Sequence, residues 1–168
     1  MQLRDPQEHD RRSIRLAYYD YATSAAYFVT LCVAGQQCLL GSVENGEFIE
    51  SAFGRIAREG WLWLERTYPY VKHDAWSLMP NHLHGIICLL PVAAERKALG
   101  QLLGAFKTTS TKKINELRHT PQAGFWQRNY YEHVIRDDKD LEGCRAYIEF
   151  NQRQWNLDHC RVQPYTWE

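Results

Sequence analysis

Residues 79–90 constrain the fold more than any other part of the chain. A Pro80-Asn81 turn leads into His82-Leu83-His84, and an apolar run over residues 86–90 follows. Such a run predicts a buried β-strand. Because side chains alternate along a strand, His82 and His84 are expected on one face. Two imidazoles on a rigid strand can bind one metal ion, although a His-x-His pattern alone is also compatible with a structural pair.

A second motif, Tyr147-Ile148-Glu149-Phe150-Asn151, lies within residues 138–155. This segment is predicted to be a helix that starts after Asp137 and carries an apolar stripe. Tyr147 and Asn151 are four residues apart and therefore share one helix face. A hydroxyl nucleophile and an amide oxygen that could bind a metal would then be presented together. The alternative is a tyrosine at the edge of the core and an asparagine near the helix end.

The two motifs together resemble a known family. The His82-Leu83-His84 triplet is similar to the signature of the HUH endonucleases, and the longer pattern resembles the single-tyrosine transposases, in particular the REP-associated tyrosine transposases. The resemblance covers roughly residues 12–158 and rests on Tyr27-Phe28-Val29-Thr30, residues 78–86, Phe106-Lys107, Lys112-Lys113-Ile114-Asn115, residues 126–136, Tyr147-Ile148, Asn151, Trp155 and Asp158. One departure is Gln152, where the family usually has proline after the asparagine.

The resemblance implies a metal-dependent enzyme that cuts and rejoins single-stranded DNA beside a hairpin. Tyr147 would be the nucleophile and would form a 5′-phosphotyrosine link. His82, His84 and Asn151 would ligate the metal, and both Mg²⁺ and Mn²⁺ suit that role. The implied partner is single-stranded DNA with a hairpin, and the resemblance leaves a homodimer open.

The charge pattern favours local rather than global contact with DNA. Twenty basic and twenty acidic residues cancel, whereas typical DNA-binding domains are basic. Basic residues nevertheless cluster in the N-terminal arm and between residues 96 and 118. Each cluster could be a solvent-exposed charged face or a set of contacts to DNA phosphates. The candidate DNA contacts are Arg11, Arg12, Lys107, Lys112, Lys113, Arg128 and Asn129.

The predicted fold class is α+β, a ferredoxin-like antiparallel sheet with helices packed on one face. We expect a single domain over residues 1–168, with a basic arm over residues 1–15 and a tail over residues 159–168. The strands are expected at 25–33, 38–43 (as a hairpin extension), 72–79, 82–90 and 129–135, and the helices at 53–64, 94–117 and 138–155. The lack of a long apolar run or signal sequence, and five cysteines without zinc-finger spacing, predict a cytoplasmic protein with reduced thiols.

Three alternatives remain open at this point. Tyr130 or Tyr131 could be the nucleophile, but neither has a ligand-type residue four positions later. His133, beside Tyr131 on one predicted strand face, could assist the site or form a structural hydrogen bond. Among functions, the rivals are a metallohydrolase that uses water, a non-catalytic hairpin-binding protein, and a replication or conjugation initiator.

Overall fold

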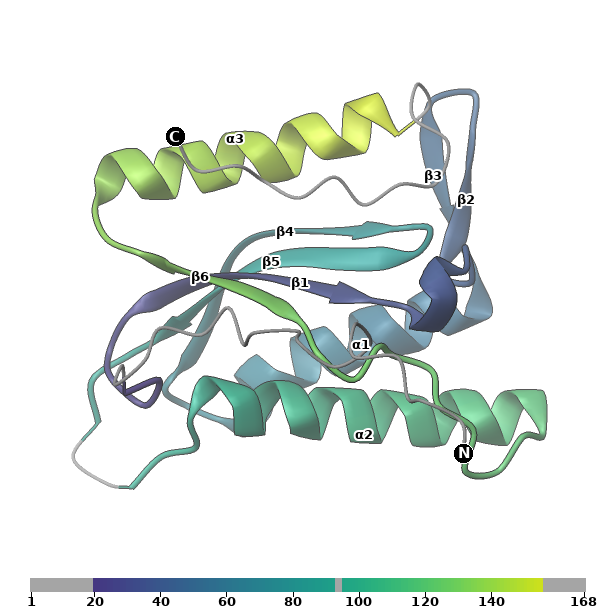
Figure 1. Ribbon diagram of the computed structural model, residues 1–168, viewed down its shortest axis with the longest axis horizontal. Coiled ribbons are helices and arrows are strands. Elements are labelled where there is room, and N and C mark those ends of the chain that lie inside the picture. The colour runs from purple at the N-terminus through teal and green to yellow at the C-terminus, as the bar shows by residue number, and fades with distance from the viewer. Residues whose placement is uncertain (1–19, 93–94, 156–168) are drawn as a thin grey trace, which may run out of the picture.

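A four-stranded antiparallel sheet in the order β4-β5-β1-β6 forms the centre of the molecule (Figure 1). The computed structural model describes residues 20–92 and 95–155. The N-terminal arm and the C-terminal tail that the sequence suggests lie outside these residues. The elements are β1 (Ala26–Cys32), the short helix η1 (Ala34–Gln36), β2 (Gly41–Glu44), β3 (Glu47–Glu50), α1 (Ala52–Thr67), β4 (Val71–Met79), β5 (His82–Leu89), α2 (Leu99–Arg118), β6 (Tyr131–Ile135) and α3 (Asp138–Gln154).

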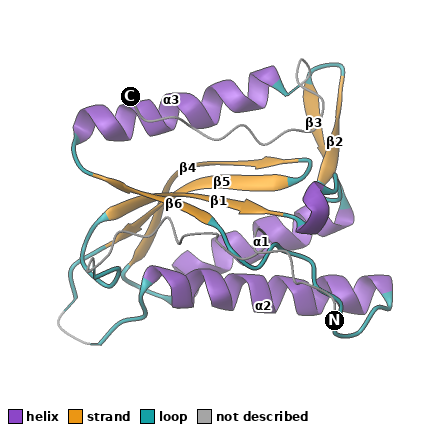
Figure 2. Ribbon diagram, viewed as in Figure 1, coloured by secondary structure: helices purple, strands orange, loops and turns teal. Residues whose placement is uncertain are grey.

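Helices α1 and α2 cover one face of the sheet (Figure 2). Their apolar stripes pack on Tyr27, Val29 and Leu31 of β1 and on neighbouring side chains of β5, and together they form the main core. The packing leaves little free space: a Cβ atom at Gly85 of β5 would lie 2.5 Å from the indole of Trp61. Glycine at this position therefore lets α1 sit directly on the histidine strand.

Helix α3 covers the opposite face of the sheet (Figure 1). Its Cys144 and Ile148 pack on Phe28 of β1 and Ile86 of β5 in a second, smaller core. The helix begins at Asp137, whose side chain accepts a hydrogen bond from the backbone N–H of Asp140 at 2.9 Å, as the sequence predicts. The side chains of β1 and β5 that point away from α1 and α2 are therefore buried beneath α3.

The predicted α+β class with an antiparallel sheet is confirmed, but the helices do not all pack on one face as the sequence interpretation expected. Two helices lie on one face and α3 on the other, because both faces of β1 and β5 carry apolar side chains. Strands β2 and β3 form a separate hairpin rather than an extension of the sheet. Their turn is Asn45-Gly46, where both residues have positive φ, 51° and 84°, as a tight hairpin turn requires. Helix α2 begins at Leu99, five residues later than position 94.

Within the described residues, no helix has both the length and the apolar character that crossing a membrane would need. Among the described residues, Cys32, Cys88 and Cys144 are free thiols. Cys160 lies outside the described residues.

Candidate active site and nucleic-acid interface

His82 and His84 lie side by side on β5, on the face that α3 covers. Both side chains are buried, with 1% of each residue exposed. Their Nε2 atoms are 2.9 Å apart. Burial lowers the pKa of His82 to about 3, and burial together with the neighbouring His82 lowers the pKa of His84 well below its usual value. Both imidazoles are therefore neutral at pH 7, the form in which a ring nitrogen can bind a metal.

The outer nitrogen of each imidazole is fixed by a hydrogen bond. His82 Nδ1 lies 2.6 Å from Asn81 Oδ1, and the Asn81 amide nitrogen donates to the carbonyl of Gln36 at 3.2 Å. Since a carbonyl only accepts hydrogen bonds, the Asn81 amide nitrogen must face Gln36 and its side-chain oxygen must face His82. His82 therefore carries its proton on Nδ1, which leaves a lone pair on Nε2. His84 Nδ1 lies 2.7 Å from the hydroxyl of Thr30 on β1, which can accept its proton in the same way.

This arrangement fits a divalent cation. Hydrogen bonds that orient the outer nitrogens are the usual support of histidine ligands. In an octahedral Mg²⁺ shell with bonds of about 2.1 Å, adjacent ligand atoms lie about 3 Å apart, close to the 2.9 Å between the two Nε2 atoms. The sequence signals Asn81 only by its place before His82, and it gives no signal for Thr30.

Helix α3 brings Tyr147 and Asn151 onto the same histidines. The Asn151 side-chain amide lies 2.9 Å from His84 Nε2, and rotation of that amide by 180° would present its oxygen instead. The Tyr147 ring lies edge-on to His84 with 5.2 Å between ring centroids, and both rings contact Phe28 of β1. The structure thus brings together all four residues predicted for catalysis and metal binding.

The two alternative tyrosines face opposite sides of β6. Tyr131 packs in the smaller core and lies edge-on to Phe28, with 6.4 Å between centroids. Tyr130 packs with the main core, and the Lys107 ammonium lies 5.3 Å from its ring centroid. Of the two, only Tyr131 therefore shares the face of the histidine pair.

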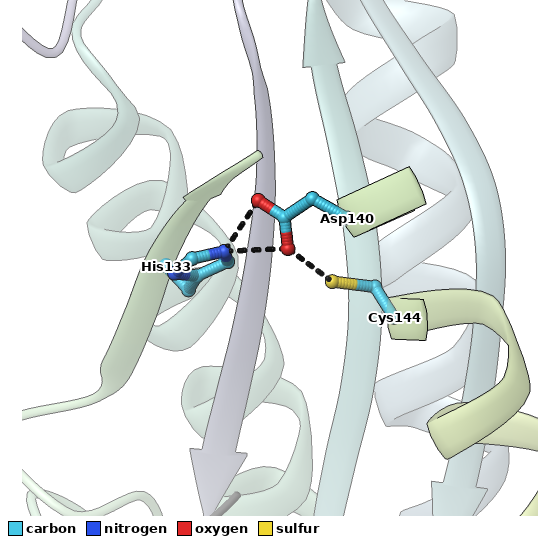
Figure 3. Close-up of side chains that lie close together, drawn as sticks. All are labelled: His133, Asp140 and Cys144. Carbon is cyan, nitrogen blue, oxygen red and sulfur yellow. Dashed lines mark hydrogen bonds and ion pairs between the residues drawn. The ribbon is translucent and has the colours of Figure 1, made fainter. Parts of the chain in front are cut away.

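A second group that could hold a metal comprises His133, Asp140 and Cys144 (Figure 3). Their ligand atoms lie within 4.8 Å of one another. His133 Nε2 lies 2.8 and 2.9 Å from the two Asp140 oxygens, and Asp140 also accepts from the backbone N–H of Arg136. Burial, with the nearby Asp140 carboxylate, raises the pKa of the Cys144 thiol to about 12. These contacts form a hydrogen-bonded link between β6 and α3. His133 thus makes the structural hydrogen bond that was one of its two sequence interpretations, whereas its partner Asp140 was not predicted.

The predicted DNA contacts have different surroundings. Lys107 donates to the carbonyls of Gln127, Arg128 and Asn129 at 2.8–3.4 Å, so its ammonium holds the segment before β6. The exposed residues of the set are Lys112, Lys113, Arg128 and Asn129. Arg11 and Arg12 lie outside the described residues.

Comparison with known proteins gives three similarities. The chain is 33% identical to an uncharacterized protein of Haemophilus influenzae over 92% of this chain and 94% of that protein. It is 33% identical to another H. influenzae protein, provisionally named a REP-associated tyrosine transposase, over half of each chain. The fold matches the structure of a REP-associated tyrosine transposase bound to a REP hairpin with a TM-score of 0.61, at 21% identity, over 83% of this chain and 72% of the other. No family model matches the chain.

The fold is α+β, with a histidine pair on a central strand that faces a tyrosine on the covering helix. The near full-length match shows that the chain belongs to one family with that H. influenzae relative. The other two matches agree with the resemblance on which the sequence interpretation rests.

Proposed function

We propose that the protein is a transposase-type enzyme that nicks and rejoins single-stranded DNA beside a hairpin, with Tyr147 as the nucleophile. One observation carries the proposal: His82 Nε2 and the Asn151 amide each lie 2.9 Å from His84 Nε2, and the Tyr147 ring lies edge-on to the His84 ring. We propose a hairpin in the substrate because the protein with the similar fold is bound to a REP hairpin.

The metal ligands in this proposal are His82 Nε2, His84 Nε2 and the side-chain oxygen of Asn151. A bound Mg²⁺ or Mn²⁺ would polarise the scissile phosphate and offset the charge that develops in the transition state. Asn81 and Thr30 keep the imidazoles in the required orientation. Phe28 packs on Tyr147 and His84 and keeps that side of the site dry.

Tyr147 attacks phosphorus through its phenol oxygen, which loses its proton to water. The bond between phosphorus and the 3′ oxygen breaks, and that oxygen takes up a proton to become a free 3′-hydroxyl. The product is a 5′-phosphotyrosine diester, which preserves the energy of the broken bond. A 3′-hydroxyl can then attack this diester and release Tyr147, so the strand is rejoined without ATP.

All four site residues come from one chain, so the proposal does not depend on a homodimer. The contacts proposed for the DNA backbone are Lys112, Lys113, Arg128 and Asn129, with Lys107 holding the segment that presents Arg128. Arg11 and Arg12 of the arm are proposed to extend these contacts. The free thiols suit a reducing compartment, and we include a cytoplasmic location in the proposal.

The test is a labelled-oligonucleotide assay with strands copied from both flanks of the protein's own gene, in Mn²⁺, read on a denaturing gel. We expect a covalent protein–DNA band with the native chain, and no band and no cleavage with Tyr147→Phe, which keeps the ring but removes the nucleophilic oxygen. DNA affinity should change little. Tyr131→Phe is the matched control, because it removes a hydroxyl from the same face of the sheet.

Each other outcome selects a rival. Cleavage by Tyr147→Phe at nearly the native rate would exclude Tyr147 and leave Tyr131 or water as the nucleophile. Cleavage by the native chain without a covalent band would indicate a metallohydrolase. Binding without cleavage, with or without metal, would indicate a hairpin-binding protein.

A further inference from the structure

A groove of about 800 Å³ runs between the second half of α2 and the segment that leads from α2 toward β6. It is lined by residues of α2, which lies on the opposite face of the sheet from α3, the helix that contains Tyr147 (Figure 1). We call it the α2 groove. Residues that line it include Lys112, Asn115, Gln122, Phe125, Trp126 and Arg128. Its volume is in the range of small-molecule sites, and a nucleotide fits within such a volume.

The floor of the α2 groove is aromatic and fixed in position. Phe125 and Trp126 are both buried and contact each other edge-on, with 5.2 Å between ring centroids. The Trp126 indole N–H donates to the hydroxyl of Ser110 on α2 at 2.9 Å. Phe125 is 2% and Trp126 7% exposed, so the two rings form a rigid apolar floor that a base would contact over a small area.

The rim of the α2 groove is positively charged. Lys112 and Arg128 are exposed on opposite sides of it, and Glu116 is the one acidic side chain among the described lining residues. An aromatic floor under two separated cations is complementary to a base with a phosphate attached. Neither a purely apolar ligand nor a polyanion without a ring would use both features.

The loop that forms the far wall is held in one conformation. The buried Asn115 amide donates to the carbonyl of Ala123 at 2.8 Å and accepts from Arg118 Nε at 2.9 Å. Arg118 also donates to the carbonyl of Gly124. Gln122 has a φ of 65°, which a non-glycine residue seldom adopts outside a strained turn or a binding loop. The groove is therefore preformed, and a ligand would not need to order it.

Backbone contacts connect the α2 groove to the histidine strand. Gln127 N–H donates to the carbonyl of Cys32 at 2.8 Å, and Cys32 pairs with His82 across β1 and β5. Because adjacent strands are about 5 Å apart, the groove wall lies roughly 10 Å along the sheet from the start of β5. A single strand of DNA could pass round this end of the sheet and reach both places within a few nucleotides.

We propose that the α2 groove binds one unpaired base and its phosphate, a few nucleotides from the phosphate that Tyr147 attacks. This inference rests on the proposed function, since it takes single-stranded DNA as the substrate. The base packs on the aromatic floor, and Lys112 and Arg128 contact the phosphates on either side. The groove thus helps to select where the strand is cut and takes no part in the chemistry.

The test measures binding of the full chain to a hairpin oligonucleotide from its own gene flanks and to copies in which each unpaired nucleotide in turn is made abasic. We expect one abasic position to weaken binding by the native chain at least tenfold. Gly124→Trp should fill the groove, since a Cβ atom at Gly124 meets open space. This variant and Lys112→Glu should bind the intact oligonucleotide about as weakly as the native chain binds the abasic one, and should lose the sensitivity to that position.

Lys113→Glu is the matched control. It reverses one charge at the next position of α2 but does not line the groove, so it should weaken binding to intact and abasic oligonucleotides alike. The proposal is overturned if Gly124→Trp and Lys112→Glu keep the native position dependence, or if Lys113→Glu removes it. The covalent band measured at saturating DNA should remain in Gly124→Trp. If no band forms even with the native chain, the proposed function fails, while the abasic comparison still tests the groove.

Discussion

Single residues set the chemistry of the histidine pair. Asn81 and Thr30 each hold the outer nitrogen of one imidazole, and both rings are buried and neutral. A metal would therefore meet two oriented lone pairs without having to displace a proton or reorganise a side chain. Removing one histidine leaves too few protein ligands to retain a cation.

We expect His82→Ala and His84→Ala each to abolish Mn²⁺ binding and strand cleavage while the domain stays folded. Calorimetric titration of Mn²⁺ and a circular dichroism spectrum of each variant provide the two measurements. Asn81→Ala should weaken Mn²⁺ binding by about 10- to 100-fold, since it removes only an orienting hydrogen bond. If either histidine variant bound Mn²⁺ as tightly as the native chain, the pair would be structural.

A third buried histidine has a different environment. His73 stacks on Trp61 at 4.4 Å between centroids, and its side chain is 3% exposed. Burial lowers its pKa to about 4, with Lys72 acting in the same direction and Glu65 against it. The unfolded chain takes up this proton near pH 6.5, so between pH 6.5 and 4 the unfolded state binds more protons than the folded state.

The contribution of neutral His73 to the free energy of unfolding should therefore be fully present above pH 6.5 and be lost as the pH is lowered toward 4. This loss should amount to at most about 3 kcal/mol. His73→Phe keeps a ring against Trp61 but cannot take up a proton. Urea unfolding of both proteins at several pH values gives the difference. Parallel curves for the two proteins would show that His73 does not contribute.

Strand alternation was enough to predict that His82 and His84 share a face, and helical spacing was enough to pair Tyr147 with Asn151. A structural hydrogen bond was one of the two interpretations of His133, but its partner Asp140 and the role of Lys107 could not be predicted. Lys107 is held by carbonyls 20 to 22 residues away. Every residue has a backbone carbonyl, so the sequence does not indicate which residues accept such hydrogen bonds. A lysine that holds a loop and a lysine that contacts phosphate look the same in a sequence.

Among the elements, α3 decides whether Tyr147, the proposed nucleophile, contacts the histidine pair. Two polar links join this helix to the sheet in addition to its apolar stripe. The half-buried Asp140 carboxylate binds His133 of β6, and the exposed Arg145 pairs with Asp74 of β4 at 2.6 Å. Asp140 lies in the first turn of α3. Its carboxylate also accepts a hydrogen bond from the backbone N–H of Arg136, which fixes the segment that leads into the helix.

We expect Asp140→Ala to lower stability by about 2 kcal/mol, because it leaves a half-buried histidine and a backbone N–H without their acceptor. Cleavage should fall as well, since Tyr147 and Asn151 depend on the position of α3. Asp74→Ala is the control, and its effect should be smaller because solvent screens the Arg145 pair. Thermal unfolding with chelator and with added Zn²⁺ completes the test. A stabilisation by Zn²⁺ that Asp140→Ala removes would instead show that His133, Asp140 and Cys144 hold a metal.

The types and order of the main elements could be predicted because each has a clear hydrophobic period. The arrangement of α3 on the second face was harder to predict, since Phe28 and Ile86 on one side and Val29 and Ile87 on the other make both faces of the sheet apolar. The late start of α2 has a similar cause. Residues 95–98 precede the helix, and the amide of Lys97 is bonded to the Tyr70 hydroxyl, a tertiary contact that local periodicity does not contain.

At the scale of the whole molecule, the charges cancel and the proposed contacts lie on both faces of one sheet. A formal net charge of zero gives no broad positive surface on which a long duplex could be held. Lys107, Lys112 and Arg128 line the α2 groove, while His82 and His84 lie on the other face of the sheet with Tyr147 of α3. A strand that visits both places must bend round the end of the sheet, which a flexible unpaired strand can do and a stiff duplex cannot.

We therefore expect cleavage of single-stranded DNA that carries a hairpin and not of the same sequence in a full duplex. Three substrates decide this: one strand with its hairpin, the same strand with the stem scrambled, and the strand annealed to its complement. The first should be cut fastest, the second slowly because the stem no longer positions the flank, and the third hardly at all because its bases are paired and cannot leave the stack. Equal rates on all three would identify a general nuclease. A preference that survives Lys112→Glu and Lys113→Glu would show that the stem, rather than phosphate contacts from α2, positions the strand.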